Sequence, residues 1–135
     1  MPNRTPMVIE PRHCDLYGHM NNAAYAELLE EGRWDFISKR GYGREAVTEL
    51  DQGPIVLELN IRFRRELNPG EKVIVECWMK QVRSRSATVS QRILAENGEL
   101  ACEAEATLAL FDLKSRRLIT PNERWKAALL MDDPA

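Results

Sequence analysis

One long helical segment followed by a run of strand-like segments is the feature that most constrains the fold of this chain. Within 22–39, apolar residues recur at helical spacing, at Tyr25, Leu28, Leu29 and Phe36. Gly41 is expected to end this helix. Gly32 costs about 0.5–1 kcal/mol relative to alanine in a helix interior, so another element is expected to approach that face closely.

Four segments after the helix carry the apolar alternation that is typical of β-strands. They are expected at 55–63, 72–82, 87–96 and 100–111, after a loop through Gly53-Pro54. Asn97-Gly98 supplies a hairpin turn. A first short strand is expected at 5–13, with Pro11 at a sheet edge or end, and a terminal helix from Pro121 through Met131.

The order of these segments predicts an α+β fold in which an antiparallel sheet wraps around one long central helix. At 135 residues the chain fits a single domain over 1–135. One protomer would leave a sheet edge unpaired, so we expect a homo-oligomer, either a dimer or a tetramer of dimers.

Composition excludes several classes of protein. The 19 basic and 21 acidic side chains are interspersed and give a formal net charge of −2, so no long-range field favours nucleic acid or an anionic membrane. The first residues lack the apolar run of a secretory signal, and no segment reaches the roughly 18 apolar residues of a membrane helix. We therefore expect a cytoplasmic protein without nucleic-acid or membrane partners.

The cysteines and histidines indicate neither a disulfide nor a metal site. Cys14, Cys77 and Cys102 are odd in number and form no CxxC pair, so reduced thiols are expected. The ligand types between His13 and His19 lack zinc spacing, and neighbours on an extended chain point in alternate directions. We expect no metal and no cofactor.

The densest group of functional side chains lies just before the long helix, between Arg12 and Asn22. A helix N-terminus presents unsatisfied backbone N–H groups and a partial positive charge, which suit an anion or a developing oxyanion. Asn21 and Asn22 are both candidates for the helix cap. Asp15 is either a local turn cap or a nucleophile or base.

This segment resembles that of the 4-hydroxybenzoyl-CoA thioesterase branch of the hotdog proteins. The likeness rests first on GHMNNAAY at 18–25, preceded by Asp15. It extends over nearly the whole chain, through IRFRRELNPGEKV at 61–73 and ILAENGELACEAEATLALFD at 93–112. The resemblance implies a hotdog fold and hydrolysis of an acyl-CoA thioester, with coenzyme A as part of the substrate.

The resemblance also implies roles for two groups near the helix start. An aspartate at the position of Asp15 attacks the thioester carbonyl or activates a water. The backbone amide that polarises this carbonyl belongs, by motif position, to Asn22. Such a preorganised N–H is worth about 2.7–4 kcal/mol of transition-state stabilisation.

A more distant likeness, to plant acyl-carrier-protein thioesterases, adds two supporting residues. Their D-x-N-x-H-V-N-N motif is matched from Asp15 to Asn22, with His19 as its histidine and Tyr17 in place of its internal asparagine. Their R-R-E glutamate is matched by Glu66. His19 and Glu66 are therefore expected to orient water or Asp15.

Further residues are expected to contact the substrate, and they are Tyr17, Gly18, Asn21, Tyr25, Leu29, Arg83 and Arg85. Tyr25 and Leu29 either line the acyl pocket or belong to the core. Arg83 and Arg85 either bind the phosphates of coenzyme A, as basic residues there do in some relatives, or form a solvated edge.

Three other functions stay open from the sequence. The first is hydrolysis of a thioester whose acyl group is carried by an acyl-carrier protein rather than by coenzyme A. The second is a hotdog hydratase or dehydratase, whose D-x-N-x-x-H motif has one residue more than the spacing from Asp15 to His19. The third is an acyl-thioester-binding protein without turnover, because a fold by itself does not specify catalysis.

Overall fold

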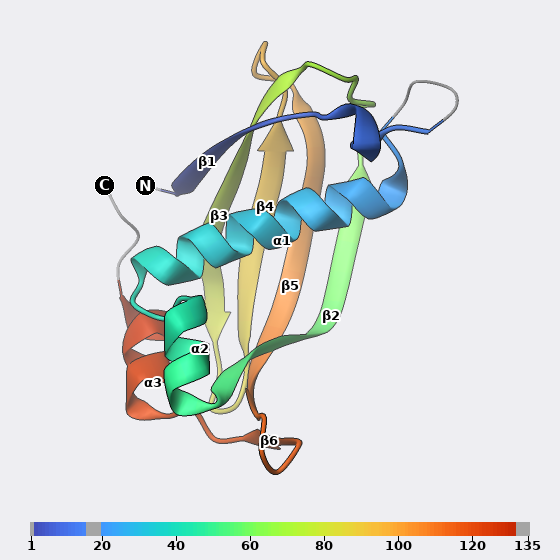
Figure 1. Cartoon of the computed structure of the whole chain (residues 1–135). Coiled ribbons are helices and arrows are strands. Elements are labelled where there is room, and N and C mark those ends of the chain that lie inside the picture. The colour runs from blue at the N-terminus through green and yellow to red at the C-terminus, as the bar shows by residue number, and fades with distance from the viewer. Residues whose placement is uncertain (1, 16–19, 132–135) are drawn as a thin grey trace.

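The computed structural model describes residues 2–15 and 20–131 of the chain. One long helix, α1 (Asn22–Lys39), crosses a curved sheet (Figure 1). The strands are β1 (Asn3–Val8), β2 (Gln52–Phe63), β3 (Lys72–Val82), β4 (Ala87–Leu94), β5 (Leu100–Asp112) and β6 (Arg117–Ile119). The shorter helical elements are a 3-10 turn, η1 (Pro11–His13), and the helices α2 (Arg44–Leu50) and α3 (Glu123–Leu130).

The sheet is antiparallel throughout, in the order β1-β3-β4-β5-β2, and the short β6 pairs with the end of β5. β1 and β2 are therefore its two edges. α1 packs mainly on β3, β1 and β4, whereas the helix that packs on β2 is α2. The predicted α+β architecture, a sheet wrapped around one central helix, is confirmed.

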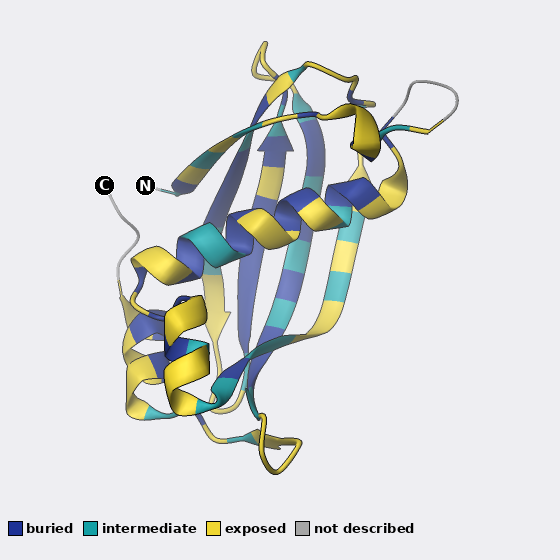
Figure 2. Ribbon diagram, in the orientation of Figure 1, coloured by how far each residue is buried: buried dark blue, intermediate teal, exposed yellow. Residues whose placement is uncertain are grey.

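The core lies between α1 and the concave face of the sheet, where β4 and β5 are buried along most of their length (Figure 2). The alternation predicted for 100–111 is confirmed, because Cys102, Ala104 and Ala106 are buried while Glu103 and Glu105 are partly exposed. In β3 the predicted face is buried at Val73, Val75 and Cys77, but Glu76 on the opposite face is buried as well. This packing holds α1 rigidly over the sheet and fixes where its first turn points.

Gly32 marks the closest approach of α1 to the sheet. A Cβ atom added there would lie 2.4 Å from Cγ1 of Val75 and 3.5 Å from Sγ of Cys77, both on β3. No side chain fits such a distance without movement. The close approach that was expected from this glycine is therefore confirmed.

Several boundaries differ from the sequence-based prediction. The strand expected at 5–13 ends at Val8, because Pro11 begins the 3-10 turn. The loop expected before 55 contains α2 instead, and Gly53-Pro54 lies inside β2. Proline is tolerated there because β2 is an edge strand.

The alternation predicted for 55–63 is wrong at Leu57 and at Phe63, which is 47% exposed at the end of the strand. The pairing of β2 with β5 shifts between Val56 and Glu58, so Leu57 occupies a bulge. Its side chain is 50% exposed instead of facing the core. Leu59 and Ile61, beyond the bulge, pack against the core as predicted.

Candidate functional site

The start of α1 is set by an asparagine cap. Asn21 has extended backbone angles, and its side-chain oxygen accepts the N–H of Ala24 at 2.9 Å. Asn21 is therefore the N-cap, and Asn22 is the first helical residue. No described hydrogen bond uses the amides of Asn22 or Ala23, which lie in the turn where a helix has no acceptor of its own.

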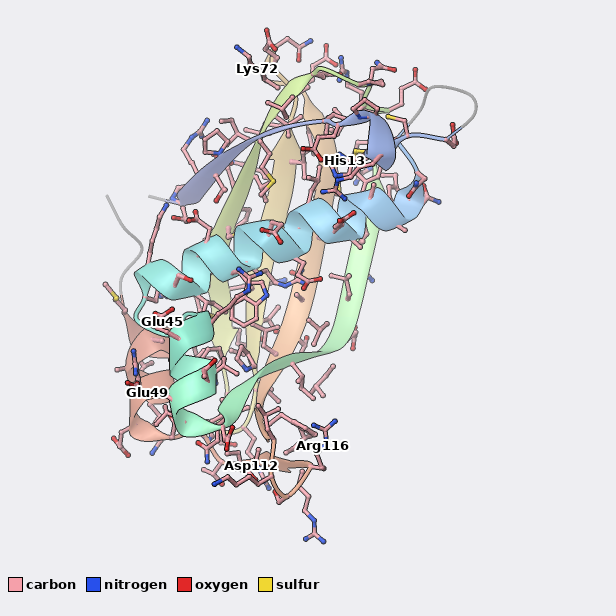
Figure 3. All side chains as sticks on the ribbon, viewed as in Figure 1. His13, Glu45, Glu49, Lys72, Asp112 and Arg116 are labelled. Carbon is pink, nitrogen blue, oxygen red and sulfur yellow. The ribbon has the colours of Figure 1, made fainter. Side chains whose placement is uncertain are left out.

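Backbone pairing brings Asp15 to this helix start. Cys14 and Met20 form an isolated antiparallel bridge, and the amide of Asn21 donates to the carbonyl of His13 at 2.9 Å. The residues on either side of 16–19 are thus held side by side. The exposed Asp15 follows this clamp directly, and His13 lies beside the first turns of α1 (Figure 3).

A second segment, Arg64 to Leu67, reaches the same place from the end of β2. The amides of Arg64 and Arg65 donate to the carbonyl of Ala101 at 2.9 and 3.1 Å. The amide of Met20 donates to the carbonyl of Leu67 at 3.1 Å. Two backbone anchors therefore hold Glu66 against the entry to α1.

Tyr25 supplies a third anchor for this segment. Its hydroxyl donates to the carbonyl of Arg65 at 2.9 Å, and its ring meets Phe63 edge to face at 5.0 Å. Burial raises the pKa of the Tyr25 hydroxyl, which stays protonated at neutral pH and keeps donating. The side chain is only 3% exposed.

These groups surround one cavity of about 550 Å³. It is lined by Asp15, Met20, Asn21, Asn22, Tyr25, Phe63, Arg64, Arg65 and Glu66. The cavity thus brings together five residues that were predicted for the site. Asp15, Asn21, Asn22 and Tyr25 come from the start of α1, and Glu66 comes from the segment after β2. Carboxylates and first-turn amides around one cavity suit attack on a carbonyl group.

The arginines at this cavity are already paired. Arg65 contacts Glu71 at 2.8 Å and Glu99 at 3.0 Å, and the hydrogen bond that it donates to Glu71 is the largest cause of its raised pKa. Arg64 is paired with Glu103. These ion pairs fasten the segment to β5, to the β4–β5 turn and to the turn before β3. They also reduce the positive field that Arg64 and Arg65 present to a substrate.

Other predicted residues do not meet this cavity. Leu29 is fully buried in the core. Arg83 and Arg85 lie in the turn after β3, and the length of β3, roughly 30 Å, separates that turn from the site. Within one protomer they therefore do not serve this cavity. Tyr17, Gly18 and His19 lie outside the described residues.

Phe63 and Met20 line the cavity and were not predicted as site residues. Phe63 was assigned to the buried face of its strand, but it is 47% exposed at the end of β2. Its position directly before the R-R-E stretch is the signal that would have indicated it.

Among the residues that the structure describes, no group of three or more His, Cys, Asp or Glu side chains is arranged to hold a metal ion. Within 2–15 and 20–131, none of the helices has the length and apolar character needed to cross a membrane.

Comparison with known proteins relates this geometry to thioesterases. A family model described as the thioesterase-like superfamily matches residues 9–129. The long-chain acyl-CoA thioesterase FadM of Escherichia coli is 29% identical over 117 residues, which cover 86% of this chain and 88% of FadM.

Solved structures agree. The probable thioesterase YbaW of Escherichia coli superposes with a TM-score of 0.79 at 28% identity, covering 93% of this chain and 95% of YbaW. The Staphylococcus aureus protein SAV2348, solved in complex with CoA, superposes over 100% of this chain and 87% of its own with a TM-score of 0.89. Its 17% identity makes that likeness one of fold alone. The chain is therefore a hotdog-fold thioester hydrolase that belongs to the thioesterase-like superfamily.

Proposed function

We propose that this protein hydrolyses acyl-CoA thioesters at the cavity before α1, with Asp15 as the nucleophile or general base and the Asn22 amide as the group that polarises the carbonyl. One observation carries this proposal: Asp15 and Asn22, the first residue of α1, line the same cavity. The likeness to FadM over most of both chains supports coenzyme A as the carrier.

The carbonyl oxygen of the substrate accepts the N–H of Asn22 in this mechanism. As the carbonyl carbon becomes tetrahedral, negative charge grows on that oxygen and the partial positive charge of the helix start stabilises it. The backbone supplies the N–H, so substitution of the Asn22 side chain is expected to matter little. Asn21 contributes by capping the helix.

Asp15 acts on the carbonyl carbon in one of two ways. As a nucleophile, its carboxylate forms the new C–O bond, the C–S bond breaks and the thiolate takes a proton. Water then hydrolyses the resulting anhydride. As a base, Asp15 takes a proton from the water that attacks the carbonyl. Both routes release a carboxylate and free coenzyme A.

Glu66 and His19 have supporting roles in this proposal, as groups that orient water or Asp15. For Glu66, the support is its place in the cavity and the three anchors on its segment. An acyl-carrier protein is the alternative carrier. A chloroplast acyl-acyl carrier protein thioesterase, ATL3 of Arabidopsis thaliana, is 27% identical over 80% of this chain and 57% of its own length.

We also propose that the active form is a homo-oligomer built on a dimer. β2 is a twelve-residue edge strand, and Val56, Leu57 and Phe63 on it are exposed by 42%, 50% and 47%. A long apolar edge of this kind favours pairing with another strand. Arg83 and Arg85 would bind coenzyme A phosphates only at the site of a neighbouring protomer.

A thiol-release assay over acyl-CoAs of differing chain length tests the proposed reaction. Asp15→Asn is expected to lower kcat/KM by about 100- to 10,000-fold, because the nucleophile or base is lost. Glu66→Gln is expected to lower it less. Asp51→Asn makes the same chemical change in the turn after α2 and should leave turnover unchanged.

The outcomes separate the reaction from its mechanism. Absence of thiol release from every thioester by the wild type would reject the hydrolase. Unchanged turnover in Asp15→Asn would reject the role of Asp15 while the reaction stands.

A further inference from the structure

The open edge of β2 carries two charged side chains that have no partner within one protomer. β2 is the last strand on its side of the sheet (Figure 1). Glu58 and Arg62 on it are exposed, and neither makes a hydrogen bond or an ion pair within 4.0 Å among the described residues. They stand four residues apart on one strand, about 13 Å, which is too far for them to pair with each other. Opposite charges spaced in this way match a second copy of the strand that runs in the opposite direction.

The backbone groups of β2 point alternately toward β5 and toward the open edge. The amide of Arg64 donates to the carbonyl of Ala101, its partner when the β2–β5 register is continued by one residue. The alternation of an antiparallel ladder then turns the backbone groups of the even-numbered residues from 58 to 64 toward β5. Those of Leu59 and Ile61 point to the edge, where no described strand pairs with them. A second strand therefore forms its ladder through Leu59 and Ile61.

A two-fold axis through Asn60 satisfies both this ladder and the charges. Two copies of β2 that pair about the axis place Leu59 opposite Ile61 of the partner subunit, as a hydrogen-bonded pair. Glu58 then lies opposite the partner's Arg62, and the same contact occurs a second time by symmetry. These are non-hydrogen-bonded pairs, in which facing side chains come closest.

The neighbouring axes match the charges less well. An axis through either charged residue brings like charges face to face. One through Leu59 sets Glu58 opposite the uncharged Asn60. One through Ile61 sets Glu58 opposite Arg64, which is already paired. Among these axes, the one through Asn60 gives both unpaired charges a partner.

The same register joins exposed apolar side chains and reaches the cavity before α1. Leu57 and Phe63 are 50% and 47% exposed, and they come opposite each other in the two subunits when Asn60 lies on the axis. Phe63 also lines the cavity that holds Asp15. The partner's Leu57 is thereby placed at the border of that cavity.

We propose that two copies of this chain pair through β2 about an axis at Asn60, with two Glu58–Arg62 ion pairs across the interface, and that the partner's Leu57 borders the cavity before α1. The inference rests on the dimer in the proposed function and specifies its register. It is independent of the reaction proposed for the cavity.

A cysteine on the axis tests the register directly. Asn60→Cys sets two thiols opposite each other with Cα atoms about 4.5 Å apart, within the range of a disulfide. Mild oxidation is expected to convert this variant into a covalent dimer that a reducing agent separates. Val56→Cys is the matched control, because residues 56 of the two subunits are roughly 26 Å apart at this register and cannot cross-link. The wild type measures the background from Cys14. Absence of a cross-link in Asn60→Cys would overturn the register.

Charge reversal tests the two ion pairs. Glu58→Arg and Arg62→Glu each set like charges opposite each other at both contacts. Each is expected to raise the Kd of the dimer by roughly 10- to 1,000-fold, measured by sedimentation equilibrium. Both reversals in one chain restore opposite charges and should return the Kd to near the wild-type value. Glu96→Arg makes the same reversal at an exposed position in the turn between β4 and β5 and should leave the Kd unchanged.

Mixing the two single variants separates the ion pairs from a folding defect. Only the mixed dimer of Glu58→Arg with Arg62→Glu has opposite charges at both contacts. At a concentration where each variant alone has the mass of one chain, 15.5 kDa, the mixture is expected to reach twice that mass. A mixture that stays monomeric, or single reversals with the wild-type Kd, would overturn the ion pairs.

Turnover of the same mixture tests the partner's place at the cavity. The kcat/KM per chain is expected to rise on mixing, together with the mass, and a dimer that forms without this rise would reject that part of the inference. The reaction is judged separately. A wild type that releases no thiol while Asn60→Cys still cross-links rejects the hydrolase and keeps the register. A wild type that hydrolyses acyl-CoA while Asn60→Cys stays uncross-linked rejects the register alone.

Discussion

At the scale of single residues, the hydroxyl of Tyr25 has an unexpected use. The sequence indicated a side chain that contacts the acyl group or packs in the core, and Tyr25 does line the cavity. Its hydroxyl, however, is bonded to the carbonyl of Arg65. Tyr25 therefore positions the residue that follows, Glu66, as well as forming part of the cavity wall.

We predict that Tyr25→Phe lowers kcat by roughly three- to tenfold with little change in KM, because the ring stays while one hydrogen bond is lost. Tyr42→Phe is the matched control, since Tyr42 donates to the carbonyl of Gln52 at 2.8 Å and is distant from the site. Steady-state kinetics of Tyr25→Phe and Glu66→Gln, alone and combined, check this. Strictly additive effects would contradict a positioning role.

Residue types and spacing were sufficient to predict a helix start at Asn21 and Asn22. The roles of Asp15 and of the Asn22 amide came from the family resemblance, because the residues alone also fit a turn cap at Asp15. The burial of Arg33 was not predicted, because its hydrogen-bond partner Gln91 is 58 residues away in the sequence. Only the family resemblance suggested that Glu66 lies at the same site as Asp15. Strand pairing brings the two residues together, and a local sequence pattern does not reveal such pairing.

At the scale of elements, the contact of α1 with β3 controls how closely the helix sits on the sheet. Gly32 and Val75 meet there with no room for a further methyl group. Because Val75 is β-branched and fully buried, its side chain has little freedom to move aside.

We predict that Gly32→Ala destabilises the protein by about 1–3 kcal/mol, since overpacking outweighs the better helix propensity of alanine. Urea unfolding measures this. Combining Gly32→Ala with Val75→Ala should cost less than the sum of the two single changes, because the smaller residue makes room. A stabilised Gly32→Ala variant would show that the helix moves freely on the sheet.

The elements themselves were predicted unevenly. α1, β3 and β5 were found because each keeps one period over ten or more residues. α2 and the first residues of β2 were missed, because Gly53-Pro54 is typical of a loop and an edge strand tolerates it. The bulge at Leu57 was invisible, because only the pairing with β5 reveals an extra residue.

At the scale of the whole molecule, β2 presents an unpaired edge with exposed apolar side chains. We predict that the wild type forms dimers or tetramers in solution and that Leu57→Lys shifts the mass toward the monomer, because a lysine on the edge opposes strand pairing. Light scattering measures the mass.

Leu130→Lys is the control for this change, since Leu130 is 72% exposed on α3, away from the sheet edge. It should leave the mass unchanged. A monomeric wild type would reject the oligomer, and an unaffected Leu57→Lys variant would place its interface on another surface.

The cavity before α1 is framed by backbone hydrogen bonds, from the amide of Met20 to the carbonyl of Leu67 and from the amide of Asn21 to the carbonyl of His13. These bonds use no side-chain atoms, so a substitution in the lining changes what the cavity contacts without removing the bonds that frame it. Relatives built on this scaffold are therefore able to vary the lining of the cavity while they keep its frame.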